Sequence, residues 1–293
     1  MATTTITVTT ATDGLDFQDD LISLREAIQI YAVQNAEAGN DSEIVFDIQD
    51  GSGSTIVLDS GGGALQVSTN LTIDGGDDGI TIDAAGSASN PNRVFDIEGT
   101  KDEQIDVGLS SLTITGGQTT GNLSNGAGAG IFAEYTDLTI DSSTITGNST
   151  SGKSADGAGI FASYSNLTVT DTVVSGNSTT GNQASGAGIA LLNSGLDLAE
   201  STIERNNTYG RSAFGGGIWA NYSTDEQSGQ ILIARSTIDN NNTTGQNSSG
   251  GGIDLSNVQN FGFEYSTLSN NSISTGGGGG LSVYGSSALI SNS

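Results

Sequence analysis

A repeat of 29 residues runs through the middle of this chain and restricts what it can fold into. Ile160 returns as Ile189, and Asn177 returns as Asn206, each 29 residues later. A unit of this size cannot bury an apolar face alone, so it must stack on copies of itself. The sequence therefore indicates a solenoid, in which equivalent residues of successive coils lie above one another.

Three columns of apolar residues recur through the repeats. The first is Leu65, Val94, Ile131, Ile160, Ile189, Ile218, Ile253 and Leu281. The second is Leu71, Ile105, Leu138, Leu167, Leu196, Ile231, Phe261 and Leu289. The third is Ile82, Ile114, Ile145, Val174, Ile203, Ile238 and Leu268. Around these columns, segments such as LTI and TIT alternate apolar and polar residues, which is typical of strands, and Gly, Asn, Ser and Asp fill the intervals.

The pattern predicts an all-β fold, a single right-handed parallel β-helix with three short strands in each coil of about 29 residues. A leucine-rich repeat would require an L-x-x-L-x-L pattern, which is absent. One asparagine follows each third-column residue by three positions, and in a stack these side chains can hydrogen-bond as a ladder. The predicted ladder is Asn148, Asn177, Asn206, Asn241 and Asn271.

The start of the chain differs from the repeats. Ser23 and Glu26 have the spacing of a capping box, and a helix is predicted at about residues 23–38. Its apolar face consists of Leu24, Ala27, Ile28 and Tyr31. We expect residues 1–40 to form an N-terminal cap and residues 41–293 to form the β-helix. The last coil stops part-way, which predicts that the β-helix is truncated at its C-terminal end.

Composition excludes several classes of function. Seven Lys and Arg stand against 33 Asp and Glu, giving a net charge of −26, which disfavours binding to nucleic acid. No apolar run is long enough for a membrane span, so we expect no membrane insertion. The absence of His and Cys removes the commonest general base and all thiol chemistry. No signal peptide is visible at the N-terminus.

Several segments resemble known bacterial proteins. The order SLREAI, EIVFDI, TIVL, LTIDG, RVFDI and LTITGG is similar to the N-terminal cap and early coils of secreted bacterial right-handed β-helix proteins, although Ile22 replaces a Cys of that motif. The pairs of GGGI with TIDNN or TLSNN resemble repeats of polymorphic outer-membrane protein passengers. The resemblance implies an extracellular or cell-surface, adhesin-like protein. Some such relatives carry calcium-binding repeats, and others on this fold cleave or epimerise acidic polysaccharides.

Aromatic residues are concentrated on one predicted face. If Ile131 points into the bore, its neighbours in the strand point outward. This parity predicts one exposed column that contains Phe132, Phe161 and Trp219, and three residues on, near the strand end, a second column contains Tyr135, Tyr164 and Tyr222. Exposed apolar patches usually mark contact surfaces. We therefore expect a face for glycan or protein binding centred on Trp219 and Tyr222. The alternative is that loops of the same chain cover it.

Two further sites are suggested by charged residues. Asp74, Asp77 and Asp78 in DGGDDG could hold calcium, or they could form an ordinary turn. A polysaccharide lyase could use Arg205 or Arg211 together with Glu204, Asp225 and Glu226. Glu204 and Arg205 are adjacent in sequence and are expected to point in different directions.

The expected function is that of an extracellular structural or adhesin-like rod whose side face binds a polysaccharide or a cell-surface protein. The alternatives are a polysaccharide lyase, epimerase or hydrolase, and a subunit of an extracellular filament or sheath that self-associates through the uncapped end.

Overall fold

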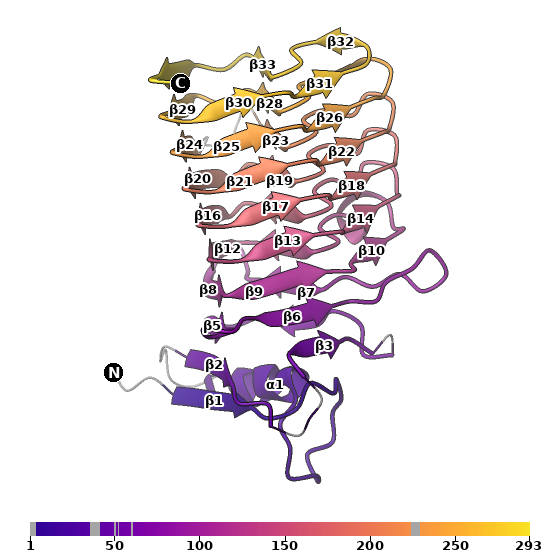
Figure 1. Ribbon diagram of the computed structural model, residues 1–293, viewed down its shortest axis with the longest axis vertical. Coiled ribbons are helices and arrows are strands. Elements are labelled where there is room, and N and C mark those ends of the chain that lie inside the picture. Colours follow the sequence, from indigo (N-terminus) through magenta and orange to yellow (C-terminus); the bar gives the residue numbers. More distant parts are fainter. Residues whose placement is uncertain (1–3, 36–41, 50, 52, 60, 224–228) are drawn as a thin grey trace.

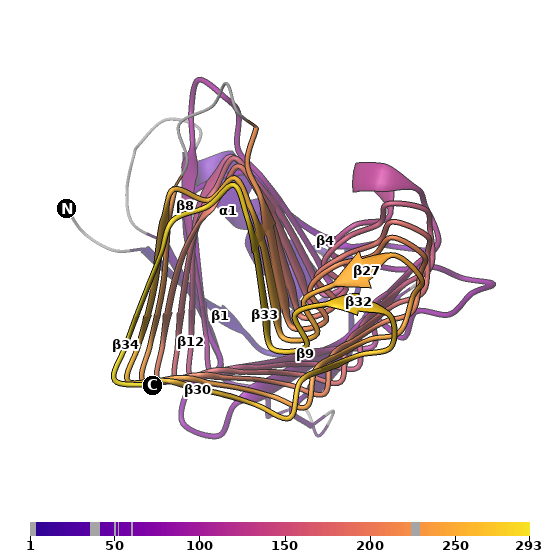
Figure 2. The same cartoon turned by 90° about the horizontal axis from the view of Figure 1, so that it is seen from above.

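The chain forms a parallel β-solenoid whose coils stack along one axis (Figure 1). The computed structural model describes residues 4–35, 42–49, 51, 53–59, 61–223 and 229–293. Every pair of neighbouring strands is parallel, and seen from the C-terminal end the coils wind in the right-handed sense (Figure 2). The predicted fold class is confirmed.

Three sheets form the walls of the main bore. Sheet A consists of β1 (Thr4–Val8), β2 (Ser42–Phe46), β5 (Leu71–Asp74), β8 (Ile105–Ser110), β12 (Thr136–Asp141), β16 (Asn166–Thr170), β20 (Gly195–Ala199), β24 (Gln230–Ala234), β29 (Asn260–Glu264) and β34 (Ala288–Ser291). Sheet B consists of β3 (Thr55–Val57), β6 (Ile80–Asp83), β9 (Leu112–Thr115), β13 (Thr144–Thr146), β17 (Val173–Ser175), β21 (Thr202–Glu204), β25 (Thr237–Asp239) and β30 (Thr267–Ser269). Sheet C consists of β4 (Leu65–Val67), β7 (Phe95–Glu98), β11 (Ile131–Glu134), β15 (Ile160–Ser163), β19 (Ile189–Leu192), β23 (Ile218–Asn221), β28 (Ile253–Ser256) and β33 (Leu281–Tyr284).

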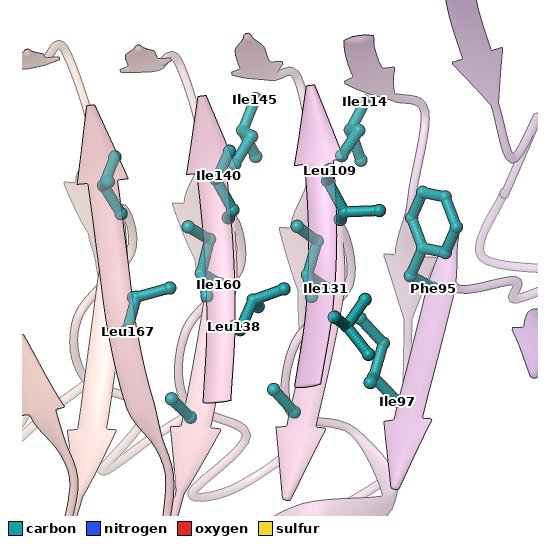
Figure 3. Packing of buried hydrophobic residues seen from close by; sticks show 14 of the residues in the cluster. Phe95, Ile97, Leu109, Ile114, Ile131, Leu138, Ile140, Ile145, Ile160 and Leu167 are labelled. Carbon is teal, nitrogen blue, oxygen red and sulfur yellow. The ribbon is translucent and has the colours of Figure 1, made fainter. Parts of the chain in front are cut away.

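The bore is filled by the apolar residues that alternate along these strands. Ile131 and Ile160 of sheet C face Leu138 of sheet A and Ile145 of sheet B, and all four are essentially inaccessible to solvent (Figure 3). Because equivalent residues of successive coils are in register, each apolar side chain packs on its counterpart above and below.

Three members of the predicted columns are displaced. The observed partners are Phe95 rather than Val94 opposite Leu65, Val107 rather than Ile105 opposite Leu71, and Ala288 rather than Leu289 opposite Phe261. In the first two cases the expected residue is also buried, so apolar character alone could not select the register.

The N-terminal helix α1 (Leu24–Asn35) packs beside β1, β2 and β4 at the start of the solenoid (Figure 1). Its predicted apolar face is buried. The capping box is present, since the Glu26 backbone N–H donates to Ser23 Oγ at 3.1 Å and the Ser23 N–H donates to Glu26 Oε2 at 2.9 Å. The helix is consistent with a cap.

The asparagine column is a continuous chain of hydrogen bonds. The amide of Asn177 donates to Asn206 Oδ1 at 3.0 Å, and the amide of Asn206 donates to Asn241 Oδ1 at 3.0 Å. Each Oδ1 also accepts the backbone N–H of the preceding asparagine in the stack. The ladder extends from Asn148 to Asn271.

In each coil, the segment that follows the ladder position forms a second lobe, which the sequence did not predict. Sheet D lies in this lobe and consists of β10 (Gln118–Thr119), β14 (Ser149–Thr150), β18 (Ser178–Thr179), β22 (Asn207–Thr208), β26 (Asn242–Thr243) and β31 (Ser272–Ile273). The 3₁₀ turn Leu123–Asn125 and the pair β27 (Ser248–Ser249) and β32 (Gly276–Gly277) also lie there. From sheet D the chain turns back beside the outer face of sheet C (Figure 2).

Buried threonines and glycines fix the lobe in place. The Thr150 hydroxyl donates to the Ala155 carbonyl oxygen at 2.6 Å, and the Thr179 hydroxyl donates to that of Ala184 at 2.9 Å. Gly157 has a φ of +63°, and a Cβ there would lie 2.2 Å from the Ile160 carbonyl oxygen. Only glycine therefore allows the lobe to approach sheet C this closely.

Candidate functional site

The first predicted aromatic column is covered by the lobe. Phe132 and Phe161 occupy equivalent positions on the outer face of sheet C, but only 4% and 5% of their surfaces are exposed. They pack with Ala127 of the lobe and with Ala190, and Trp219 lies half-buried against this cluster. The expectation that Phe132 and Phe161 are exposed is therefore wrong, and the alternative, that loops of the same chain cover this face, is what the structure shows at these two residues. These residues are not part of the candidate site.

We call the contact between the lobe and sheet C the seam. Arg93 lies at the N-terminal end of this seam. Its guanidinium carbon lies 4.7 Å from the centre of the Phe132 ring. The guanidinium donates to the Gly128 and Ala127 carbonyl oxygens and pairs with Asp96 at 2.8 Å. Burial lowers the pKa of Arg93, and Asp96 opposes that shift. Arg93 therefore has a structural role, since it joins the lobe to sheet C.

Tyr222 is also buried, contrary to the prediction. Its hydroxyl donates to the Ser194 carbonyl oxygen, and 1% of its surface is exposed. Tyr135, Tyr164 and Asn193, at the equivalent corner of earlier coils, all have a φ of +51°, whereas Tyr222 lacks this left-handed conformation. With this different backbone conformation, the ring turns into the core. Burial raises the pKa of its phenol.

Tyr135 and Tyr164 remain at the surface, where sheet C turns into sheet A. Their rings are stacked, with centroids 5.2 Å apart and planes inclined by 13°. Both are half-buried. They line a pocket of about 270 Å³, whose other lining residues are Lys101, Gln104, Ser165, Asn166, Asn193, Gly195 and Gly229. This tyrosine pocket is the candidate site.

Two departures from the regular coil shape the tyrosine pocket. The segment between β7 and β8 projects from this corner (Figure 2), and its tip is closed by a bridge between Thr100 and Glu103. From this segment the Gln104 side-chain amide donates to the Tyr164 carbonyl oxygen at 3.2 Å. On the sheet A side, Gly195 lies opposite Asn166 and presents no side chain.

The missing side chain at Gly195 opens a path onto sheet A. A second hollow of about 180 Å³ adjoins there and shares Asn166 and Gly195 with the tyrosine pocket. Its other lining residues are Leu167, Thr168, Leu196, Asp197, Gln230 and Leu232. An extended ligand can therefore run from the tyrosines over the outer face of sheet A.

The predicted calcium ligands lie in a turn after β5. Asp74 Oδ1 accepts from the Gly76 N–H and from Ser110 Oγ, both at 3.0 Å. Among the residues the structure describes, no group of three or more carboxylates is arranged to hold a metal. Calcium binding by Asp74, Asp77 and Asp78 stays a prediction.

The residues considered for a lyase are only partly brought together. Arg205 forms an ion pair with Glu204, so the expectation that these two side chains point apart is wrong. Arg205 has a φ of +54°, which folds its side chain back beside its neighbour. Arg211 lies in a turn of the lobe, and Asp225 and Glu226 lie outside the described residues.

Three carboxyl groups missed by sequence reasoning lie on sheet C or in the seam. Burial raises the pKa of Asp156 to about 7, although a hydrogen bond from the Ser185 N–H opposes the shift. Burial also raises the pKa of Asp254, which accepts from Ser249. Burial and the nearby Glu98 raise the pKa of Glu134. Because the lobe was not predicted, no sequence signal marked these acids as buried.

Comparison with known proteins assigns no relatives to the chain. No family model, no curated protein and no solved structure matches it. Within the described residues, no helix combines the length and apolar character needed to span a membrane.

Proposed function

We propose that this protein is an extracellular or cell-surface, adhesin-like rod that binds a glycan in the tyrosine pocket. The observation that carries the proposal is the stacked pair Tyr135 and Tyr164 in a pocket that the amide side chains of Gln104, Asn166 and Asn193 also line. Tyrosine offers an apolar ring and a hydroxyl, and Asn and Gln offer both donors and acceptors. A sugar has matching chemistry, with apolar C–H faces and a rim of hydroxyls.

The scaffold supports this proposal. A ligand-binding pocket is most effective when rigid elements hold its residues in place. Both tyrosines directly follow strands of sheet C, which are hydrogen-bonded to neighbours on both sides and lie over a filled bore. The location outside the cell rests on the resemblance of the SLREAI cap and the GGGI repeats to secreted bacterial β-helix proteins.

The test is a binding screen that compares wild type with the double variant Tyr135→Asn, Tyr164→Asn. Asparagine tolerates the left-handed backbone of both positions and is the natural residue at Asn193 in the next coil. The matched control is Tyr265→Asn, since Tyr265 is 63% exposed, has a φ of +50° and lies outside the pocket. We expect the double variant to lose at least about tenfold in affinity and the control to bind like wild type. Equal binding by all three proteins contradicts the proposal.

A glycan-cleaving enzyme is the second candidate, and one observation favours it. Glu98 and Glu134 lie directly opposite each other on β7 and β11, and the pKa of Glu134 is raised. A pair of carboxyl groups, one of which has a raised pKa, is typical of glycosidases. Release of reducing ends from a bound glycan that stops in Glu134→Gln supports this function, whereas no release by wild type rejects it.

A further inference from the structure

We propose that the tyrosine pocket selects a sugar that carries a carboxylate, with Lys101 as its partner. This inference rests on the proposed function and adds the class of ligand. Among the described residues that line the pocket, Lys101 is the one charged residue. In a chain with 33 acidic and 7 basic residues, it is unusual that the described lining includes a lysine and no carboxylate.

The ammonium group of Lys101 is available to a ligand. The ion pairs of the described residues all involve arginines, namely Arg25, Arg93, Arg205 and Arg235. Lys101 is exposed and has no ion-pair partner among these residues. A carboxylate bound beside the tyrosines would therefore replace only water around the ammonium group.

The net charge of −26 does not prevent this selection. At physiological ionic strength, exposed charges more than about 8 Å apart are largely screened, so the local charges decide. Asp102 and Glu103 follow Lys101 in an exposed turn but do not line the pocket. The nearby Asp137 carboxylate accepts a hydrogen bond from the Asn166 amide at 2.6 Å.

The adjoining hollow sets the preference for the next sugar. The described residues that line it include the exposed carboxylate of Asp197 and no basic residue. A second carboxylate there would meet a like charge. With about 270 Å³ in the pocket and about 180 Å³ in the hollow, each space suits roughly one sugar unit. The structure thus assigns a glycan in which one acidic unit is followed by a neutral one.

The experiment uses matched pairs of oligosaccharides. The probes contain glucuronate, galacturonate or mannuronate alternating with neutral sugars, and each is compared with its carboxyl-reduced form and with an oligomer made only of that uronate. Wild type is compared with Lys101→Gln and with the control Lys153→Gln, which removes an exposed lysine of the lobe outside the pocket. The tyrosine double variant described above is measured in parallel.

We expect wild type to bind an alternating oligosaccharide about 1.5- to fivefold more tightly than its reduced form, the range of an exposed ion pair. Lys101→Gln should remove that preference, Lys153→Gln should keep it, and the all-uronate oligomer should bind more weakly than the alternating one. Tyrosine-dependent binding without an acid preference, or a preference that survives in Lys101→Gln, overturns this inference and leaves the proposed function standing. If no probe distinguishes wild type from the tyrosine double variant, both fail.

Discussion

At the scale of single residues, Asn206 shows how the stack is held together. Its side chain is fully buried and takes part in four hydrogen bonds, two accepted from Asn177 and two donated to Val174 and Asn241. Removing it leaves buried donors and acceptors without partners, each costing about 1–3 kcal/mol.

We therefore expect Asn206→Ala to lower the free energy of unfolding by at least about 3 kcal/mol, measured by denaturant titration. The neighbouring Asn207→Ala is the control, since the Asn207 amide makes an exposed hydrogen bond to the Arg205 carbonyl oxygen. It should cost under about 1 kcal/mol. Equal losses in the two variants would contradict a structural role for the ladder.

Asp156 makes stability depend on pH. Its pKa is about 7 in the folded protein against an ordinary value of 3.8, so the folded state holds a proton that the unfolded state releases. The stability gained by protonation is complete below about pH 4 and is lost as the pH rises through about 7.

Asp156→Asn keeps an acceptor for the Ser185 N–H and removes the charge. We expect it to stabilise the protein by about 2 kcal/mol at pH 8 and by little at pH 4.5, measured from melting curves at both values. Asp171→Asn changes the net charge equally at an exposed position and controls for general repulsion. If Asp156→Asn gained the same stability at both pH values, the gain would not come from the titration of Asp156.

At the scale of elements, Arg25 joins the cap to the solenoid. Its guanidinium pairs in a bidentate manner with Asp13, at 2.9 and 2.8 Å, and donates to the carbonyl oxygens of Gly62, Gly63 and Ala64. The first coil is thereby fixed against α1. Lysine cannot reproduce this fork of donors.

Arg25→Lys should cost about 2–3 kcal/mol and speed hydrogen exchange in β1 to β5. Since solenoid coils contact mainly their neighbours, exchange in the later coils should stay unchanged. The control Arg235→Lys alters an exposed pair with Glu200 and should cost under about 1 kcal/mol. If hydrogen exchange in Arg25→Lys became faster along the whole chain, the effect of Arg25 would not be limited to the cap and the first coils.

How much the sequence predicts also depends on the element. Strands with alternating residues and the capped helix were predictable, because their periodicity reports which face is buried. The lobe was not predictable, because its Gly, Ser and Thr residues are equally common in exposed turns. Its hydrogen bonds form only when the coils are stacked. The contact of Arg25 with the first coil was not predictable either. Its guanidinium donates to backbone carbonyl oxygens 37 to 39 residues away, and backbone carbonyls leave no signal in a sequence. Tyr135 and Tyr164 were found from their place near the strand end, three residues after the phenylalanine column, whereas Tyr222 was misplaced because its backbone lacks the left-handed conformation of the equivalent residues.

At the scale of the whole molecule, the last described coil presents an open edge. Tyr284, Leu289 and Ile290 of β33 and β34 are 75%, 62% and 54% exposed. Unpaired strand edges with apolar residues pair readily with other chains. A polypeptide that consists of these 293 residues alone should therefore self-associate.

Sedimentation equilibrium over a range of concentrations checks this expectation. Leu289→Lys with Ile290→Lys should shift the protein towards its monomer mass of 29.4 kDa, whereas the control Val33→Lys, on the exposed side of α1, should not. A wild-type mass that stays monomeric at all concentrations would count against association through this edge.

The central claim is that the tyrosine pocket binds a glycan, and a crystal structure of the protein with its tightest-binding oligosaccharide tests it most directly. The account predicts a sugar ring in van der Waals contact, within about 4.5 Å, with Tyr135 or Tyr164, and a carboxylate of the ligand beside Lys101. A sugar bound on another face of the solenoid, with the pocket empty, would contradict it.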